Sequence, residues 1–176
     1  MTTDLETRIR AAIRDVPDFP KPGIVFKDIT PLLQNGALFK DLITTLGVRY
    51  RHEAIAQIVA IESRGFIFGA ALAHELGIGL TLVRKPGKLP AQTAGIDYAL
   101  EYGTDRLEIH ADALSPGDRV LIVDDLLATG GTCSATIELV QELGAHVVEA
   151  LFMIELSFLP GREALNDTPI YALTAY

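Results

Sequence analysis

The chain has 176 residues, about the length of one domain at roughly 150 residues each, and 49% of them are apolar. Fifteen basic against 23 acidic side chains give a net charge of −8, which argues against a sequence-independent grip on nucleic acid or on an anionic membrane. The single cysteine, Cys133, excludes an internal disulfide. No apolar run approaches the ~20 residues of a membrane span, and residues 1–10 are charged and polar. We therefore expect a cytoplasmic protein that binds neither nucleic acid nor membrane.

The first elements expected along the chain are two helices. Thr3 and Glu6 form a capping box, after which apolar residues recur at helical spacing as far as Val16. Three prolines within residues 15–22 end this helix. After a short apolar segment, Asn35 is placed to cap a second helix.

From residue 55 onward, short β-branched runs alternate with helical stretches. The pattern predicts strands over 55–61, 79–83, 120–123 and 146–156 and helices over 66–76 and 132–143. This alternation is typical of parallel βαβ units and predicts an α/β fold, a central and mainly parallel sheet with helices on both faces. Two further strands, over 98–101 and 106–110, flank a turn at Gly103 and follow a polar loop over 84–95.

The strand over 120–123 is followed by a string that is suited to a sugar phosphate. Open α/β sheets bind ligands at the carboxyl ends of their strands, and the amides at a helix N-terminus attract an anion. Glycines permit close approach, threonine hydroxyls add hydrogen bonds, and carboxylates accept hydrogen bonds from sugar hydroxyls. The residues of this predicted site are Asp124, Asp125, Ala128, Thr129, Gly130, Gly131 and Thr132.

Other interpretations of this string compete with the sugar-phosphate site. A helix-capping turn with solvated aspartates is the plainest one, because glycine and threonine occur in many loops. A Walker B carboxylate after an apolar strand is a second possibility, but it needs a P-loop, and Leu82 stands where Gly87-Lys88 would need a preceding glycine. Leu82 also interrupts the dinucleotide-binding pattern that Gly77 and Gly79 begin.

Two more predicted strand ends carry cations beside small residues. A run of charges is usually a solvated surface. Here, however, three strands bring anion-binding groups to the same edge of the sheet, which favours a second anionic group bound there. The candidate residues are Ser63, Arg64, Arg84, Lys85 and Lys88.

Residues 120–132 resemble the phosphoribosyl pyrophosphate (PRPP) motif of the type I phosphoribosyltransferases. Further segments occur in the order of that family and are similar to its members that use adenine: 17–30, 62–69, 83–90, 98–103 and 161–163. The resemblance covers nearly the whole chain. It implies one domain over 1–176, with a base-binding segment over 1–34 and a flexible loop and hairpin over 84–110 that closes over the substrates.

The resemblance implies transfer of the 5-phosphoribosyl group from PRPP to adenine, giving AMP and pyrophosphate in purine salvage. The loop 128–132 would hold the 5-phosphate, and Asp124 and Asp125 would face the ribose hydroxyls. Pyrophosphate would be surrounded by Ser63, Arg64, Arg84, Lys85 and Lys88. Mg²⁺ would be bound mainly through PRPP and pyrophosphate oxygens, with no metal ligand set of the protein's own. Members of the family are typically homodimers, and the Glu62–Ser63 peptide is expected to be cis.

The resemblance also assigns the base site and the proton transfer. Phe26 would stack on the purine, and the backbone of Val25 and Lys27 would contact its edge, although related chains commonly have arginine at position 27. Enzymes for 6-oxopurines have an aspartate where this chain has Ala128, so the acid–base role falls to Glu101. Arg64 would assist the departure of pyrophosphate.

Two other functions stay open on the sequence. One is a phosphoribosyltransferase for another purine base, which a panel of bases would distinguish. The other is a PRPP-sensing regulator that binds nucleic acid without catalysis, against which the acidic charge argues.

Overall fold

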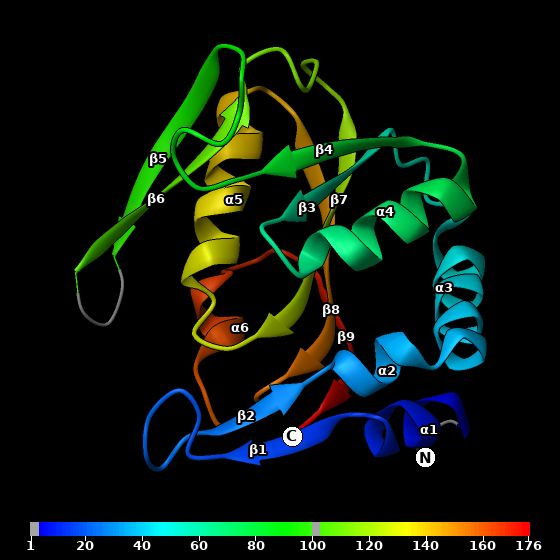
Figure 1. Cartoon of the computed structure of the whole chain (residues 1–176). Coiled ribbons are helices and arrows are strands. Elements are labelled where there is room, and N and C mark those ends of the chain that lie inside the picture. Colours follow the sequence, from blue (N-terminus) through cyan, green and yellow to red (C-terminus); the bar gives the residue numbers. More distant parts are fainter. Residues whose placement is uncertain (1–3, 100–102) are drawn as a thin grey trace. The chain divides into compact units, whose positions relative to one another are not determined.

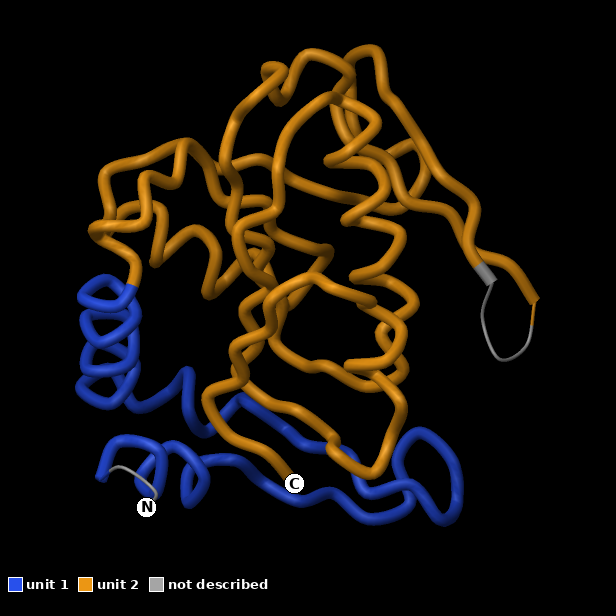
Figure 2. Tube along the Cα trace, turned by 180° about the vertical axis from the view of Figure 1, so that it is seen from behind, with its two compact units in different colours: residues 1–49 blue, residues 50–176 orange. Residues whose placement is uncertain are grey.

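The computed structural model describes residues 4–99 and 103–176 and divides into two compact units, residues 1–49 and 50–176 (Figure 2). Thr3 of the expected capping box and Glu101, the expected acid–base residue, lie outside the described residues. Among the residues that are described, no helix is long and apolar enough to cross a membrane.

The N-terminal unit begins with a shorter helix than its apolar pattern predicts. Helix α1 ends at Ala11, and Val16 lies on a strand, so the expectation of a helix reaching Val16 is wrong. The strand forms because Val16 pairs across an antiparallel hairpin with Phe26. The elements of this unit are α1 (Asp4–Ala11), β1 (Arg14–Pro17), β2 (Val25–Asp28), α2 (Thr30–Gln34) and α3 (Gly36–Tyr50), which ends on the first residue of the next unit.

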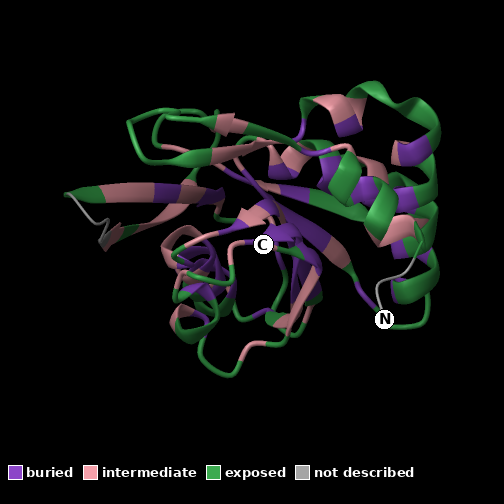
Figure 3. Ribbon diagram, turned by 90° about the horizontal axis from the view of Figure 1, so that it is seen from below, coloured by how far each residue is buried: buried purple, intermediate pink, exposed green. Residues whose placement is uncertain are grey.

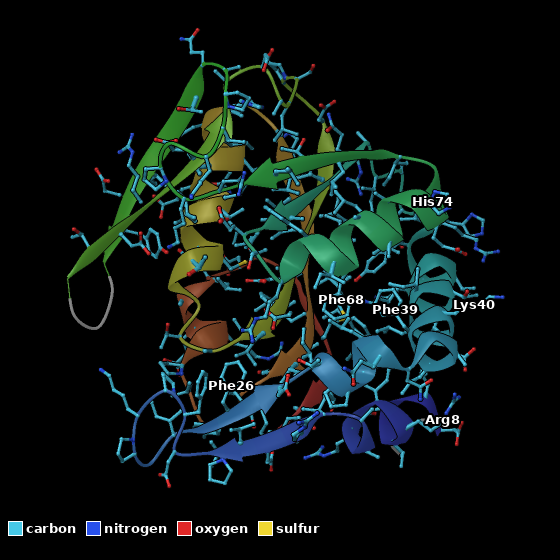
Figure 4. The ribbon with its side chains drawn as sticks, viewed as in Figure 1. Arg8, Phe26, Phe39, Lys40, Phe68 and His74 are labelled. Atoms are coloured by element: carbon cyan, nitrogen blue, oxygen red, sulfur yellow. The ribbon has the colours of Figure 1, made fainter. Side chains whose placement is uncertain are left out.

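Two polar contacts organise the helices of this unit. The Asn35 carboxamide oxygen accepts the Leu38 amide at 3.1 Å, which confirms the predicted cap of α3. The Arg8 guanidinium of α1 donates to the Asp41 carboxylate of α3 at 2.8 Å; Arg8 is labelled in Figure 4.

The C-terminal unit is built on a five-stranded sheet in which every neighbouring pair is parallel, as predicted (Figure 1). Its strands lie in the order β4 (Gly79–Val83), β3 (Gln57–Ile61), β7 (Arg119–Leu127), β8 (His146–Glu155) and β9 (Ile170–Ala175). Strand β9 was not anticipated. Strand β7 continues four residues beyond the predicted end at Val123, because its pairing with β8 runs on to Leu127.

Helices cover both faces of this sheet, and strand periodicity explains how. Ile58 faces α4 (Gly65–Leu76), where a Cβ on Gly69 would come 2.7 Å from the Ala60 methyl carbon. Val59 and Ile61 point the other way, into the core that contains residues of α5 (Gly131–Glu142). The two helices lie on opposite sides of the sheet in Figure 1, and the central strands are buried in Figure 3.

An antiparallel hairpin, β5 (Thr93–Ala99) and β6 (Thr104–His110), packs against α5. Strand β5 begins five residues earlier than predicted because its pairing with β6 extends back to Thr93. The last helix, the short α6 (Gly161–Ala164), also contacts α5 and was not predicted.

Candidate functional site

The connection from β7 to α5 forms a small cavity. Gly130 precedes the helix with φ +83°, and the first amides of α5 have no carbonyl within the helix to which they can donate. The cavity measures about 80 Å³, far below the ~300–1,000 Å³ that enclose drug-sized ligands, so it suits one small group. It is lined by Asp124, Leu126, Leu127, Ala128, Thr129, Gly130, Gly131, Thr132, Cys133 and Phe152. The residues predicted to bind a sugar phosphate, which we call the cradle, therefore all line one cavity except Asp125.

Asp125 follows Asp124 on β7 without lining the cavity, and it is 3% exposed. Its Oδ2 atom lies 2.9 Å from Arg64 Nε and forms an ion pair with it, but the two groups are not aligned for a hydrogen bond. Among the described residues, nothing donates a hydrogen bond to this buried oxygen. Unsatisfied buried oxygens are uncommon in folded proteins, and the guanidinium charge of Arg64 compensates this one.

The two aspartates carry their charge at a cost in stability. Burial and the neighbouring Asp125 carboxylate raise the pKa of Asp124 well above its ordinary range. Burial also raises the pKa of Asp125, against the opposing effect of the Arg64 guanidinium. The folded protein therefore retains protons that the unfolded chain releases, so these groups lower stability as the pH rises above about 4.

Asp124→Asn should therefore stabilise the protein at pH 7 while weakening AMP binding. The amide removes the buried charge, and its oxygen can still accept the Asp125 amide, which donates to Asp124 at 2.8 Å. We expect the melting temperature to rise by roughly 2–4 °C, the shift that about 1 kcal/mol produces at this size. The gain should vanish below pH ~4. Thermal melts across pH test this against Asp167→Asn, which removes an exposed carboxylate. A lower melting temperature at pH 7 would contradict it.

Arg64 and Ser63 lie at the turn into α4. The Glu62–Ser63 peptide is cis, as expected, and Arg64 occupies the N-cap position of the helix. A Cβ on Gly65 would come 2.7 Å from the Val123 carbonyl oxygen, so only glycine lets this turn approach the end of β7. Gly65 thus brings Arg64 to the aspartate pair, a role that its sequence position did not reveal.

Arg84 and Lys85, which follow β4, both contact Glu62, the residue that follows β3. Arg84 Nε and the Lys85 amide donate to Glu62 Oε2 at 3.2 and 2.9 Å. Burial raises the pKa of Glu62, but these bonds outweigh it and hold that pKa below its ordinary value. Arg84 also donates to the Lys88 carbonyl at 3.0 Å, while the Lys88 side chain is exposed. Glu62, which the sequence did not single out, thus holds the Arg84 guanidinium and the Lys85 backbone at the end of the sheet.

Helix α6 packs against the loop that lines the cavity. A Cβ on Gly161 would come 2.4 Å from the Ala128 carbonyl oxygen, and one on Gly130 would come 2.6 Å from the Gly161 carbonyl oxygen. The Arg162 guanidinium donates two hydrogen bonds of 2.7 Å to the Glu155 carboxylate at the end of β8. This bidentate pair fixes α6 to the sheet, and α6 in turn fixes the loop.

The predicted base-binding residues lie on β2 in the N-terminal unit. The Phe26 ring stands edge-on to Phe19 with a centroid distance of 5.2 Å; Phe26 is labelled on β2 in Figure 4. Lys27 Nζ donates to the Asp15 carboxylate at 2.6 Å, and Val25 is 49% exposed. The lysine side chain is thereby engaged within its own hairpin. Their contact with adenine stays a prediction.

No group of three or more histidine, cysteine or acidic side chains among residues 4–99 and 103–176 is arranged to hold a metal ion. The adjacent Asp124 and Asp125 carboxylates are the acidic groups beside the cavity. This donor set suits an ion that keeps oxygen ligands from water and substrate, the usual state of protein-bound Mg²⁺.

Comparisons with known proteins agree with this geometry. Residues 28–157 match the family described as Phosphoribosyl transferase domain. The chain is 56% identical over 172 residues to an adenine phosphoribosyltransferase of Roseiflexus sp. (strain RS-1), covering 98% of this chain and 100% of that protein. It is 57% identical to that of Syntrophotalea carbinolica, covering 96% and 98%.

Two crystal structures resemble the fold closely. The adenine phosphoribosyltransferase of Thermoanaerobacter pseudethanolicus superposes with a TM-score of 0.94 at 51% identity, covering 97% of this chain and 99% of that chain. The Saccharomyces cerevisiae enzyme, complexed with adenine and an imino-altritol bisphosphate, has a TM-score of 0.92 at 42% identity, covering 96% and 98%.

Proposed function

The chain belongs to the phosphoribosyl transferase family, among its adenine phosphoribosyltransferases, and we propose which of its residues carry that reaction. The reaction transfers the 5-phosphoribosyl group of PRPP to adenine, forming AMP and releasing pyrophosphate. The observation that supports it best is the cavity of about 80 Å³ at the start of α5, together with the Asp124 carboxylate that lines it. A phosphate group and a neighbouring sugar hydroxyl match this pair of features.

The 5-phosphate is bound by the loop 128–132, where helix amides and the Thr129 and Thr132 hydroxyls donate to its oxygens. Asp124 and Asp125 accept hydrogen bonds from the ribose hydroxyls. Because this loop is packed between β7 and α6, the phosphate is held at a fixed place relative to both carboxylates.

Pyrophosphate is bound by Ser63, Arg64, Arg84, Lys85 and Lys88. Its departure leaves positive charge on the ribose ring and builds negative charge on the leaving group. Cations already in place stabilise this separation most where water is excluded. The carboxylates near Arg64 and Arg84 hold both guanidinium groups in position before substrate arrives.

Adenine is bound by Val25, Phe26 and Lys27, and Glu101 moves the proton at its imidazole ring. The loop of this chain offers Ala128 in place of an acid, so the motif itself supplies no proton donor or acceptor for the base. We therefore assign this proton transfer to Glu101, in the segment 84–110.

Mg²⁺ neutralises pyrophosphate oxygens when it is bound, and the Asp124 and Asp125 carboxylates are the groups that would hold its water ligands. We further infer a homodimer in the cytoplasm, as expected from the sequence. Light scattering tests the first inference, and fractionation of cells tests the second.

A panel of bases tests the function. With PRPP and Mg²⁺, adenine should yield AMP and an equal amount of pyrophosphate, while hypoxanthine, guanine and xanthine yield little. Faster turnover of another purine would favour the alternative specificity. Binding of PRPP without any turnover, together with binding of nucleic acid, would favour the PRPP-sensing regulator.

Arg64→Ala should lower kcat/KM for PRPP by roughly tenfold or more while changing AMP affinity less, because AMP lacks the pyrophosphate that Arg64 contacts. The matched control is Arg119→Ala at the opposite end of β7, where the guanidinium donates to the Glu53 carbonyl at 3.2 Å. Steady-state kinetics and AMP titration measure both. Normal turnover with poor AMP affinity would contradict the placement of Arg64.

A further inference from the structure

Lys85 carries a contact that the proposed reaction does not use. Its Nζ atom forms an ion pair with the Asp105 carboxylate and donates to the Tyr98 hydroxyl at 3.2 Å. Asp105 and Tyr98 face each other across the hairpin, as register partners on β6 and β5. A cation expected at the pyrophosphate thus already has an anion from the hairpin.

The same cluster reaches the phosphate loop. The Tyr98 hydroxyl lies 3.3 Å from Asp105 Oδ2 and 3.4 Å from the Thr132 hydroxyl, which belongs to the first turn of α5 and lines the cavity. The contacts therefore run from Lys85 through the hairpin to the 5-phosphate cradle. All of these residues belong to the C-terminal unit.

Asp105 differs from the other carboxylates that hold cations here. Asp125 is buried and the Glu62 side chain is only 18% exposed, so both are built into the frame of the site. Asp105 is joined to Lys85 by side chains alone, and both side chains are partly exposed, at 30% and 38%. A partly exposed pair of this kind is weak enough for a ligand to displace.

The charges of the pair support one another. The hydrogen bond from Lys85 holds the pKa of Asp105 below its ordinary value. Burial lowers the pKa of Lys85, but its bonds to Asp105 and Tyr98 outweigh this and raise it. Both groups are thus charged at neutral pH, and the carboxylate can compete with an anionic ligand for Lys85.

We propose that Asp105 sets the affinity for the pyrophosphate end of PRPP, by occupying Lys85 until the ligand displaces it. This rests on the proposed role of Lys85 in pyrophosphate binding. The ligand must break the Lys85–Asp105 pair before it gains Lys85, so its apparent affinity is the intrinsic affinity multiplied by the fraction of molecules in which the pair is open. Asp105 is thereby an affinity-determining residue that need not touch the reacting atoms.

Asp105→Asn tests the proposal as a gain of affinity, which a damaged fold would not produce. Asparagine keeps the size of the side chain and the acceptor Oδ1, to which the Arg106 amide donates at 2.8 Å, but removes the charge that holds Lys85. We expect Kd for pyrophosphate and KM for PRPP to fall about three- to tenfold. AMP affinity should stay within about twofold.

The matched control is Asp97→Asn on the same hairpin. Asp97 is the register partner of Arg106, and their side chains form an ion pair at 3.1 Å. Asp97→Asn therefore removes the same charge from the hairpin without removing a contact to Lys85. Asp105→Asn should also lose its effect when combined with Lys85→Met. Binding of pyrophosphate no tighter than in Asp97→Asn would overturn the proposal, and so would an equal gain in the Lys85→Met background.

Wild-type turnover separates this proposal from the function on which it rests. If adenine and PRPP give AMP but Asp105→Asn gains no affinity, only the role of Asp105 fails. If the wild type forms no AMP, the proposed function fails, and titration with pyrophosphate still measures the competition for Lys85.

Discussion

Gly130→Ala should lower kcat/KM for PRPP by at least about 100-fold and weaken AMP binding as strongly. Residue 130 has a backbone φ of +83°. The new methyl group would lie 2.6 Å from the Gly161 carbonyl oxygen and 2.8 Å from the Ala164 side chain. The loop must therefore move away from α6. A displacement of about 1 Å in a positioning element is enough to cost a factor of that size.

Gly117→Ala is the control for this effect. Gly117 has a similar φ of +88°, but a Cβ there would meet nothing within 4 Å. Both variants carry the strain of alanine in the left-handed region, roughly 1–2 kcal/mol, so both should melt at lower temperature. Only Gly130→Ala should lose activity and AMP affinity. Equal activity in the two folded variants would show that the loop does not hold the phosphate.

Glu101→Gln should lower single-turnover AMP formation by roughly 100-fold or more, the range of a lost general acid–base group. Glutamine preserves size and hydrogen bonding but can neither take nor release the proton. PRPP affinity should remain close to that of the wild type, since the ribose and pyrophosphate contacts are assigned elsewhere.

The control for this substitution is Glu142→Gln, at the exposed end of α5. It removes the same charge from the protein and should leave turnover unchanged. A rate for Glu101→Gln within a few-fold of the wild type would mean that water or backbone manages the proton. The effect should appear in kcat rather than in KM for PRPP, because the group acts on the transition state.

Much of the C-terminal unit follows from local patterns in the sequence. The β-branched run 57–61 has the period of two that places Val59 and Ile58 on opposite faces, and Gly77 ends α4 in the left-handed conformation, at φ +67°. The string from Asp124 to Thr132 was predictable because its residue types, not its distant neighbours, create a helix N-terminus beside carboxylates. The cradle needs few long-range contacts to be recognised.

What the sequence did not reveal depends on contacts between distant segments. Gly161 matters because it touches Ala128, 33 positions away, and nothing local in residues 161–164 indicates this. Lys85 and Asp105 meet because the backbone of Arg84, after β4, pairs with that of Glu108 on β6. Strand β7 is longer than the apolar stretch 120–123 because its pairing with β8 continues past Asp124 and Asp125. These features arise from tertiary packing, which overrides local preference.

The cations at the carboxyl end of the sheet share a common arrangement. Arg64, Arg84 and Lys85 each pair with a carboxylate of the C-terminal unit. Such pairs keep long side chains in a few conformations, so less order must be created when an anion binds. The arrangement thus combines preorganisation at the two arginines with competition at the lysine.

Backbone amide shifts during titration with AMP test the central claim most directly, that the loop after β7 receives the phosphoribosyl group. The largest changes should fall on the amides of Thr129 to Thr132 and on Asp124 and Asp125, and Gly130→Ala should abolish them. Inorganic phosphate alone should move the loop amides but not the aspartates, because it has no ribose hydroxyls. If AMP binds while the amides of residues 128–132 remain unshifted, the phosphate is held elsewhere and the account is wrong.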